Sequence, residues 1–311
     1  MLRRPGGVRR GVLVAAALAV GLIGAACEPL RNAPPGGGEV LTQTFRIGPF
    51  TLGPGQDAMG SPTSGIPRPA GAFGLKGARF NVVDASGTPV SPHDVHLHHI
   101  VLTTSARQDS LCPGRRERFI GAGMERTPIS FGDPYAYLVG SADQWGAIYH
   151  VMNETPAGTP SKTVYIQYTL EYQPGATASN TRALTPLFQD VTGCSGGSTY
   201  DVPGDGGPGS VHVNTREWSV PSDGILVFTA GHLHDGGIDI RLRNVSTGDL
   251  LCKGVASYHE NPRHLATINS CALHHRVEPG QRLRVAARYD NSSPLQDVMG
   301  IMLTYTWWGR Q

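Results

Sequence analysis

The chain has 311 residues, and its 26 Lys and Arg against 24 Asp and Glu leave a formal net charge of +2. This near balance argues against a nucleic acid or an anionic surface as the partner, so we expect no nucleic-acid binding. The 41 glycines and 24 prolines exceed what is typical of helical proteins but fall short of low-complexity disorder. They indicate many short strands joined by turns.

The N-terminus has the pattern of a bacterial export signal. The basic stretch "MLRRPGGVRR" precedes "GVLVAAALAVGLIGAAC", an apolar segment too short for a comfortable membrane span. "GAAC" fits a loose lipobox, which predicts that residues 1–27 are a lipoprotein signal peptide ending at Cys27, the lipidated residue. Cleavage by an ordinary signal peptidase near Ala26 would instead leave a free thiol. We therefore expect an exported protein at the bacterial cell surface or in the periplasm, attached to the membrane through its lipid.

After a flexible tether over residues 28–40, short runs alternate between apolar and polar residues. The alternation is clear in "VYIQYTLEY" (164–172), "IDIRLR" (238–243) and "RLRVAARYD" (282–290). A period of two predicts strands with one buried face. No long stretch after the signal holds a helical period, so the predicted fold is all-β.

The richest internal Gly, Ser and Pro stretch is "CSGGSTYDVPGDGGPGS" (194–210). It predicts a linker over residues 196–207 between two antiparallel β-sandwich (jelly-roll) domains in tandem. The domains would span residues 41–195 and 208–311, each a suitable size for this architecture.

Four cysteines remain after Cys27, and an even number in an exported chain suggests two disulfides. Four cysteines allow three connectivities. Local pairing would give Cys112–Cys194 and Cys252–Cys271, one disulfide in each half.

Two histidines stand two residues apart in "GHLHDGG", which begins shortly after the apolar run "ILVF". On a strand, His232 and His234 would share a face with Cα atoms about 6–7 Å apart. Both imidazoles could then reach one metal ion, since metal–nitrogen bonds are near 2 Å. The alternative is a pair of surface histidines on a polar face.

A second group lies upstream in "HDVHLHHIVL". In an ideal strand His96 and His98 share a face and His99 points the opposite way. A bulge could instead turn His98 and His99 toward one ion. Four further histidines stand alone, which is usual for structural or exposed residues: His150, His212, His259 and His264.

A methionine near the C-terminus supplies a candidate thioether. In "DVMGIMLTYTWW", Met299 shares a face with Ile301 and Leu303, while Met302 points the other way. Both could be core residues. A ligand set of two histidines and a methionine favours copper, because thioethers suit Cu(I) and imidazoles suit both oxidation states.

With His98-His99, the His232-x-His234 motif and Met299 in this order, the chain resembles the copper type II, ascorbate-dependent monooxygenases. The resemblance covers about residues 40–310. It implies two jelly-roll domains with one copper each, ascorbate as the reductant, and an unknown small-molecule or peptide substrate. His98 and His99 would bind the electron-storage copper, and His232, His234 and Met299 the copper at which substrate reacts.

The chain departs from that family at two places that affect the activity expected of it. The first site lacks a clear third histidine, because Glu171 stands where the family has one and His150 is the nearest substitute. Ala230 and Leu303 occupy the positions at which the peptide-amidating branch grips a substrate carboxylate. The chain is therefore not expected to act on a C-terminal glycine.

In their amino-acid sequence the motifs more closely resemble those of the plant stress-up-regulated nodulin-type family, which also occurs in bacteria. "LHHIVL", "GHLHDGG" and "DVMG" resemble its strands, and Cys252 with Cys271 its intervening cysteine pair. Three functions follow as alternatives: a copper monooxygenase, a non-enzymatic stress-related copper-binding surface lipoprotein and, least favoured, a metal-dependent hydrolase. The hydrolase lacks the further motifs that such sites require.

Overall fold

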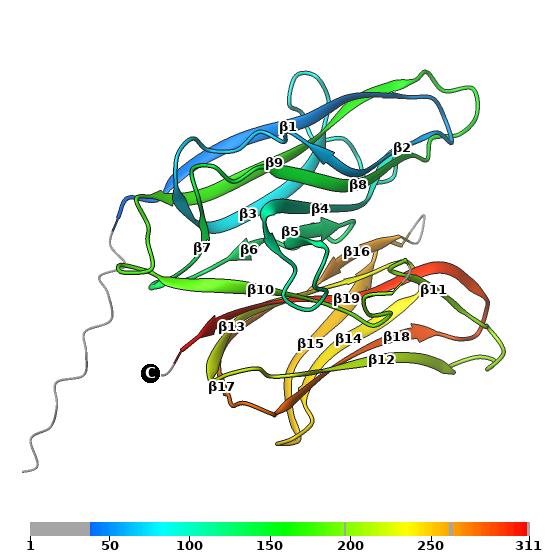
Figure 1. Ribbon diagram of the computed structural model, residues 1–311. Coiled ribbons are helices and arrows are strands. Elements are labelled where there is room, and N and C mark those ends of the chain that lie inside the picture. Colours follow the sequence, from blue (N-terminus) through cyan, green and yellow to red (C-terminus); the bar gives the residue numbers. More distant parts are fainter. Residues whose placement is uncertain (1–37, 196, 261–263, 310–311) are drawn as a thin grey trace, which may run out of the picture. The chain divides into compact units, whose positions relative to one another are not determined.

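A computed structural model (Figure 1) describes residues 38–195, 197–260 and 264–309, which belong to one compact unit. These residues form strands and turns with no helix. Accordingly, this part of the chain has no helix that is long and apolar enough to cross a membrane. The predicted signal peptide, Cys27 and nearly all of the tether lie outside the described residues.

The largest sheet formed by the described residues contains strands from both halves of the chain. Strand β7 (Tyr135–Val139) pairs in parallel with β10 (Arg182–Asp190), which pairs antiparallel with β19 (Leu295–Trp308). The hydrogen-bonded order is β1 (Leu41–Leu52), β9 (Lys162–Pro174), β3 (Phe73–Val83), β7 (Tyr135–Val139), β10 (Arg182–Asp190), β19 (Leu295–Trp308), β13 (Gly224–Leu233) and β17 (Cys271–Val277). Two short strands join this path, β6 (Ile129–Ser130) beside β3 and β11 (Thr199–Val202) beside β19.

Two smaller antiparallel sheets complete the fold. The sheet of the N-terminal half has the order β2 (Asp57–Ser64), β8 (Trp145–Asn153), β4 (Val95–Gln108) and β5 (Arg116–Gly123). The sheet of the C-terminal half has the order β12 (Val211–Ser219), β18 (Arg282–Asp290), β14 (Gly237–Asn244), β15 (Asp249–Tyr258) and β16 (Leu265–Ile268). The all-β prediction is confirmed, whereas the division into tandem jelly rolls stays a prediction.

Strand β19 lies between two hydrophobic cores, and its alternation explains how both are filled. Ile301, Leu303 and Tyr305 pack in the core of the N-terminal half. Met302 is fully buried in the core of the C-terminal half. Because successive side chains of a strand point to opposite faces, one strand serves both cores.

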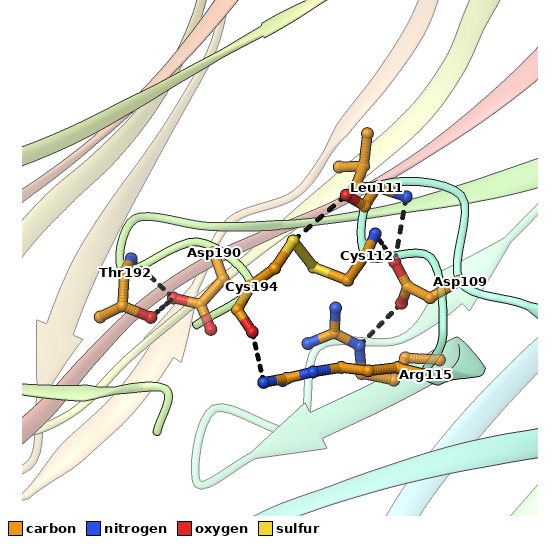
Figure 2. Close-up of a disulfide and its surroundings, with 8 residues drawn as sticks. Asp109, Leu111, Cys112, Arg115, Asp190, Thr192 and Cys194 are labelled. Atoms are coloured by element: carbon orange, nitrogen blue, oxygen red, sulfur yellow. Dashed lines mark hydrogen bonds and ion pairs between the residues drawn. A yellow bond between two sulfur atoms is a disulfide. The ribbon is translucent and has the colours of Figure 1, made fainter. Parts of the chain in front are cut away.

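Both predicted disulfides are present, Cys112–Cys194 and Cys252–Cys271. Figure 2 shows the first, which joins the loop between β4 and β5 to the segment after β10. There Asp109 accepts hydrogen bonds from two backbone N–H groups of the loop, and Arg115 donates to the carbonyl of Cys194. Two disulfides are typical of an oxidising, exported environment.

Candidate metal centre

A β-bulge in β4 brings two adjacent histidines together. Leu97 lies opposite Val151 of β8, but His99 lies opposite His150, so His98 is an extra residue in the ladder. As a result the Nδ1 atoms of His98 and His99 are 3.2 Å apart. The bulge that the sequence left as an alternative is therefore the arrangement in the structure.

His150 of β8 completes a set of three. One ligand nitrogen from each of His98, His99 and His150 lies within 4.8 Å of the others. His150 also places its Nε2 atom 2.9 Å from Oδ2 of Asp57. These three imidazoles can converge on one metal ion after small side-chain movements.

His232 and His234 of the C-terminal half lie next to this set of three histidines. His232 lies opposite Ile301, on the face of β13 that is turned to the N-terminal half. The ring centroids of His232 and His234 are 5.2 Å apart, and those of His234 and His98 are only 4.1 Å apart. The two groups, which the family resemblance assigns to separate coppers, thus adjoin one another. We call His98, His99, His150, His232 and His234 the five-histidine centre.

A glycine makes this approach possible. Gly123 of β5 lies opposite His99, and a Cβ atom there would be 2.3 Å from Cε1 of His232. Any side chain at this position would displace the imidazole from the centre.

The two C-terminal imidazoles are oriented by hydrogen bonds to their Nδ1 atoms. His234 places Nδ1 2.8 Å from the carbonyl oxygen of Asp297, which can only accept, so Nδ1 carries the proton and Nε2 the lone pair. His232 places Nδ1 3.2 Å from a carboxylate oxygen of Glu125, whose side chain is 2% exposed. A backbone N–H, that of Gly123, in turn holds this carboxylate at 2.8 Å.

The opposite nitrogens of these two rings are the ligand atoms that remain available. Nε2 of His232 and Nε2 of His234 are buried and have no hydrogen-bond partner among the described residues. A buried polar atom without a partner costs about 1–3 kcal/mol. Imidazoles held at one nitrogen by a carboxylate or carbonyl and open at the other are the usual arrangement of metal-ligating histidines.

Burial keeps three imidazoles of this centre, those of His98, His99 and His234, neutral. Desolvation, with a contribution from the neighbouring histidines, lowers the pKa of His98 to about 2 and that of His99 to about 3. The same causes lower the pKa of His234 well below its ordinary value. These imidazoles are therefore unprotonated at neutral pH, as metal binding requires.

Met299 and His232 line one cavity of about 330 Å³ between the two halves. Met299 lies on the same face of β19 as Ile301 and Leu303, whereas Met302 points into the other core, as the alternation predicted. Ala230 and Leu303, which lie opposite each other on β13 and β19, also line this cavity. The two positions that the resemblance assigns to gripping a substrate carboxylate are therefore part of an apolar cavity wall.

Sequence reasoning identified the five histidines and Met299 but missed their partners. Glu125 lies far from the histidine motifs in sequence. Asp297 begins the "DVMG" motif but contacts His234 through its backbone carbonyl, which no residue type or spacing signals. His96 lies in a different group: it contacts Glu154, its Nδ1 atom 3.1 Å from Oε1. His264, which stands alone in sequence, contacts the other carboxylate oxygen of Glu154 at 3.3 Å.

No protein-family model matches the chain, and no curated protein is significantly similar to it in sequence. The assignment to a family therefore stays a prediction that depends on the motifs given above.

Proposed function

We propose that this is an exported copper-binding protein whose five-histidine centre holds one or two copper ions. The observation that carries the proposal is the pair of buried Nε2 atoms on His232 and His234, each on a ring whose Nδ1 is already engaged. Met299, which lines the same cavity as His99 and His232, favours copper over zinc, since a thioether is a ligand for Cu(I). Attachment to the bacterial membrane through a lipid on Cys27 belongs to the same proposal.

The chain itself would contribute binding and orientation. Glu125 and the Asp297 carbonyl hold the rings of His232 and His234 in place, and burial keeps the His234 imidazole unprotonated. Copper, when bound, supplies one-electron redox chemistry.

Metal analysis of protein purified in the presence of copper tests this proposal. We expect one or two copper equivalents per chain. His234→Ala should weaken copper binding by more than about 100-fold, because loss of a ligand costs more affinity than loss of a residue that only hydrogen-bonds to a ligand. His212→Ala is the matched control, because His212 lies on β12 beside Tyr200 and outside the centre. Zinc alone in the purified wild type would overturn the proposal.

The cavity favours a second candidate function, the oxygen- and ascorbate-dependent hydroxylation of a small molecule or peptide. Its volume of about 330 Å³ falls within the range of small-molecule sites. The apolar pair Ala230 and Leu303 points to a substrate with an apolar body.

Oxygen uptake with ascorbate separates the enzyme from the binding protein. We expect Met299→Ala to lower an ascorbate-dependent rate at least about tenfold, whereas Met59→Ala, at a side chain that is 70% exposed, leaves it unchanged. Equal background rates in all three proteins would leave the non-enzymatic, stress-related copper-binding role.

A further inference from the structure

A second group of potential ligands lies beside the five-histidine centre. His96 belongs to β4, Glu154 directly follows β8, and His264 directly precedes β16. One ligand atom from each lies within 4.8 Å of the other two. The group therefore combines two residues of the N-terminal half with one of the C-terminal half.

The separations within this group suit a small tetrahedral ion. Glu154 Oε1 is 3.1 Å from Nδ1 of His96, and its Oε2 is 3.3 Å from Nε2 of His264. Ligands bonded to zinc at 2.0–2.1 Å lie about 3.3 Å from one another when the geometry is tetrahedral. Each histidine is thus already at ligand spacing from one oxygen of Glu154, and side-chain movement alone can bring the three ligand atoms around one ion.

The side chain of His264 has a hydrogen-bond partner of the kind that usually orients a metal-ligating histidine. His264 places Nδ1 2.8 Å from Oδ2 of Asp235, while Oδ1 of Asp235 accepts the backbone N–H of Leu265 at 2.6 Å. The carboxylate is fixed by the strand, so it can fix the imidazole and leave Nε2 for a metal.

The group also has an incompletely bonded atom and space around it. Oε2 of Glu154 is buried and, in the described part of the chain, accepts no hydrogen bond. His96 is 8% exposed. His96, Glu154 and Asp235 line a cavity of about 310 Å³, which His98 and His234 of the neighbouring centre also line. This cavity leaves room for water as a fourth ligand.

We propose that His96, Glu154 and His264 form a second metal site, separate from the copper centre and selective for zinc. Two imidazoles and one carboxylate with an open fourth position are a ligand set of zinc proteins. The hard carboxylate disfavours Cu(I), which the neighbouring histidines and Met299 suit. The chain would then hold two metals of different kinds side by side, since the ring centroids of His96 and His98 are 5.5 Å apart.

The position of the site gives it a structural role. Because its ligands come from both halves, a bound ion connects the N-terminal four-stranded sheet to β16 of the C-terminal sheet. An ion that binds only the folded state stabilises it by mass action. Zinc should therefore raise the midpoint of thermal unfolding.

Zinc titration of the full chain, first loaded with copper, tests the site. The wild type should take up one further equivalent of zinc, and Glu154→Gln should lose it. Glu217→Gln is the matched control, because Glu217 is a partly buried carboxylate that pairs with two arginines. It lies on β12, the edge strand opposite β16 in the C-terminal sheet. Asp235→Asn should retain the site with roughly tenfold weaker zinc binding.

Two further measurements keep the outcome decisive. His264→Gln changes a partly exposed residue and should abolish the same equivalent even if Glu154→Gln folds poorly. Zinc titration of the copper-free wild type and of copper-free Glu154→Gln should still differ by one equivalent, so the result does not depend on whether the five-histidine centre binds copper. Zinc uptake that is absent in the wild type, or equal in the wild type, Glu154→Gln and His264→Gln, would overturn the proposal.

Discussion

The two histidine sets of the five-histidine centre are held in different ways. In the N-terminal set, a bulge turns His98 and His99 toward each other, and their Nδ1 atoms are in contact. In the C-terminal set, each Nδ1 is engaged by a group outside the pair, the buried Glu125 or the Asp297 carbonyl. The comparison suggests that the C-terminal set is preorganised for a metal by groups outside it, whereas in the N-terminal set the two rings contact each other and must adjust slightly to bind one.

The largest expected effects come from removing the disulfide that supports each half. Cys112–Cys194 closes a loop of 82 residues and Cys252–Cys271 one of 19, so chain entropy predicts losses of about 4.5 and about 3 kcal/mol in unfolding free energy. Chemical denaturation of the two double Cys→Ser variants measures this difference. A larger loss from the shorter loop would show that strand contacts near β13, and not loop length, dominate.

An intermediate effect concerns the carboxylates that contact the histidines. Glu125→Gln should weaken copper binding about tenfold, because a buried partner orients His232. Asp57→Asn should change it less than about threefold, since Asp57 is 44% exposed and solvent screens its contact with His150. Equal effects of the two variants on copper affinity would contradict the proposed preorganisation of the C-terminal set.

The smallest effect is a pH dependence of the metal-free protein. An unfolded histidine has a pKa near 6.5, whereas His99 in the folded state has a pKa of about 3. Between these values the unfolded chain binds the extra proton, so stability falls as pH decreases, by about 1 kcal/mol at pH 5.5 for one such residue. Below the folded pKa the effect levels off.

Denaturation of the wild type and His99→Asn at pH 7.5 and pH 5.5 checks this sign. The variant should lose less stability than the wild type over that interval. A larger loss in the variant would contradict the burial of a neutral imidazole.

Much of the strand pattern could be predicted from the sequence. The alternation in 164–172 and 282–290 corresponds to β9 and β18, with the apolar residues buried from Val164 to Leu170 and from Leu283 to Tyr289. In "IDIRLR" the prediction was less accurate, because a bulge leaves Ile238 half-buried and buries Asp239, which pairs with Arg288. A bulge depends on the partner strand, which the local pattern does not contain.

The same limit applies to the candidate site. Period two alone favoured His96 with His98, and only pairing with β8 brings His98 to His99. Glu125 and Glu154 reach the histidines through contacts between sheets, as does His264. Such contacts arise from packing of segments distant in sequence, so no spacing in the chain encodes them.

The pairing of β10 with β19 has a consequence for any attempt to divide the protein. A chain cut within residues 196–207 would separate these two strands, which are hydrogen-bonded from Leu184 with Trp307 to Asp190 with Ile301. The isolated C-terminal fragment would then present a long apolar strand edge, a surface on which chains self-associate. Fragment expression and module exchange should therefore keep both halves in one polypeptide.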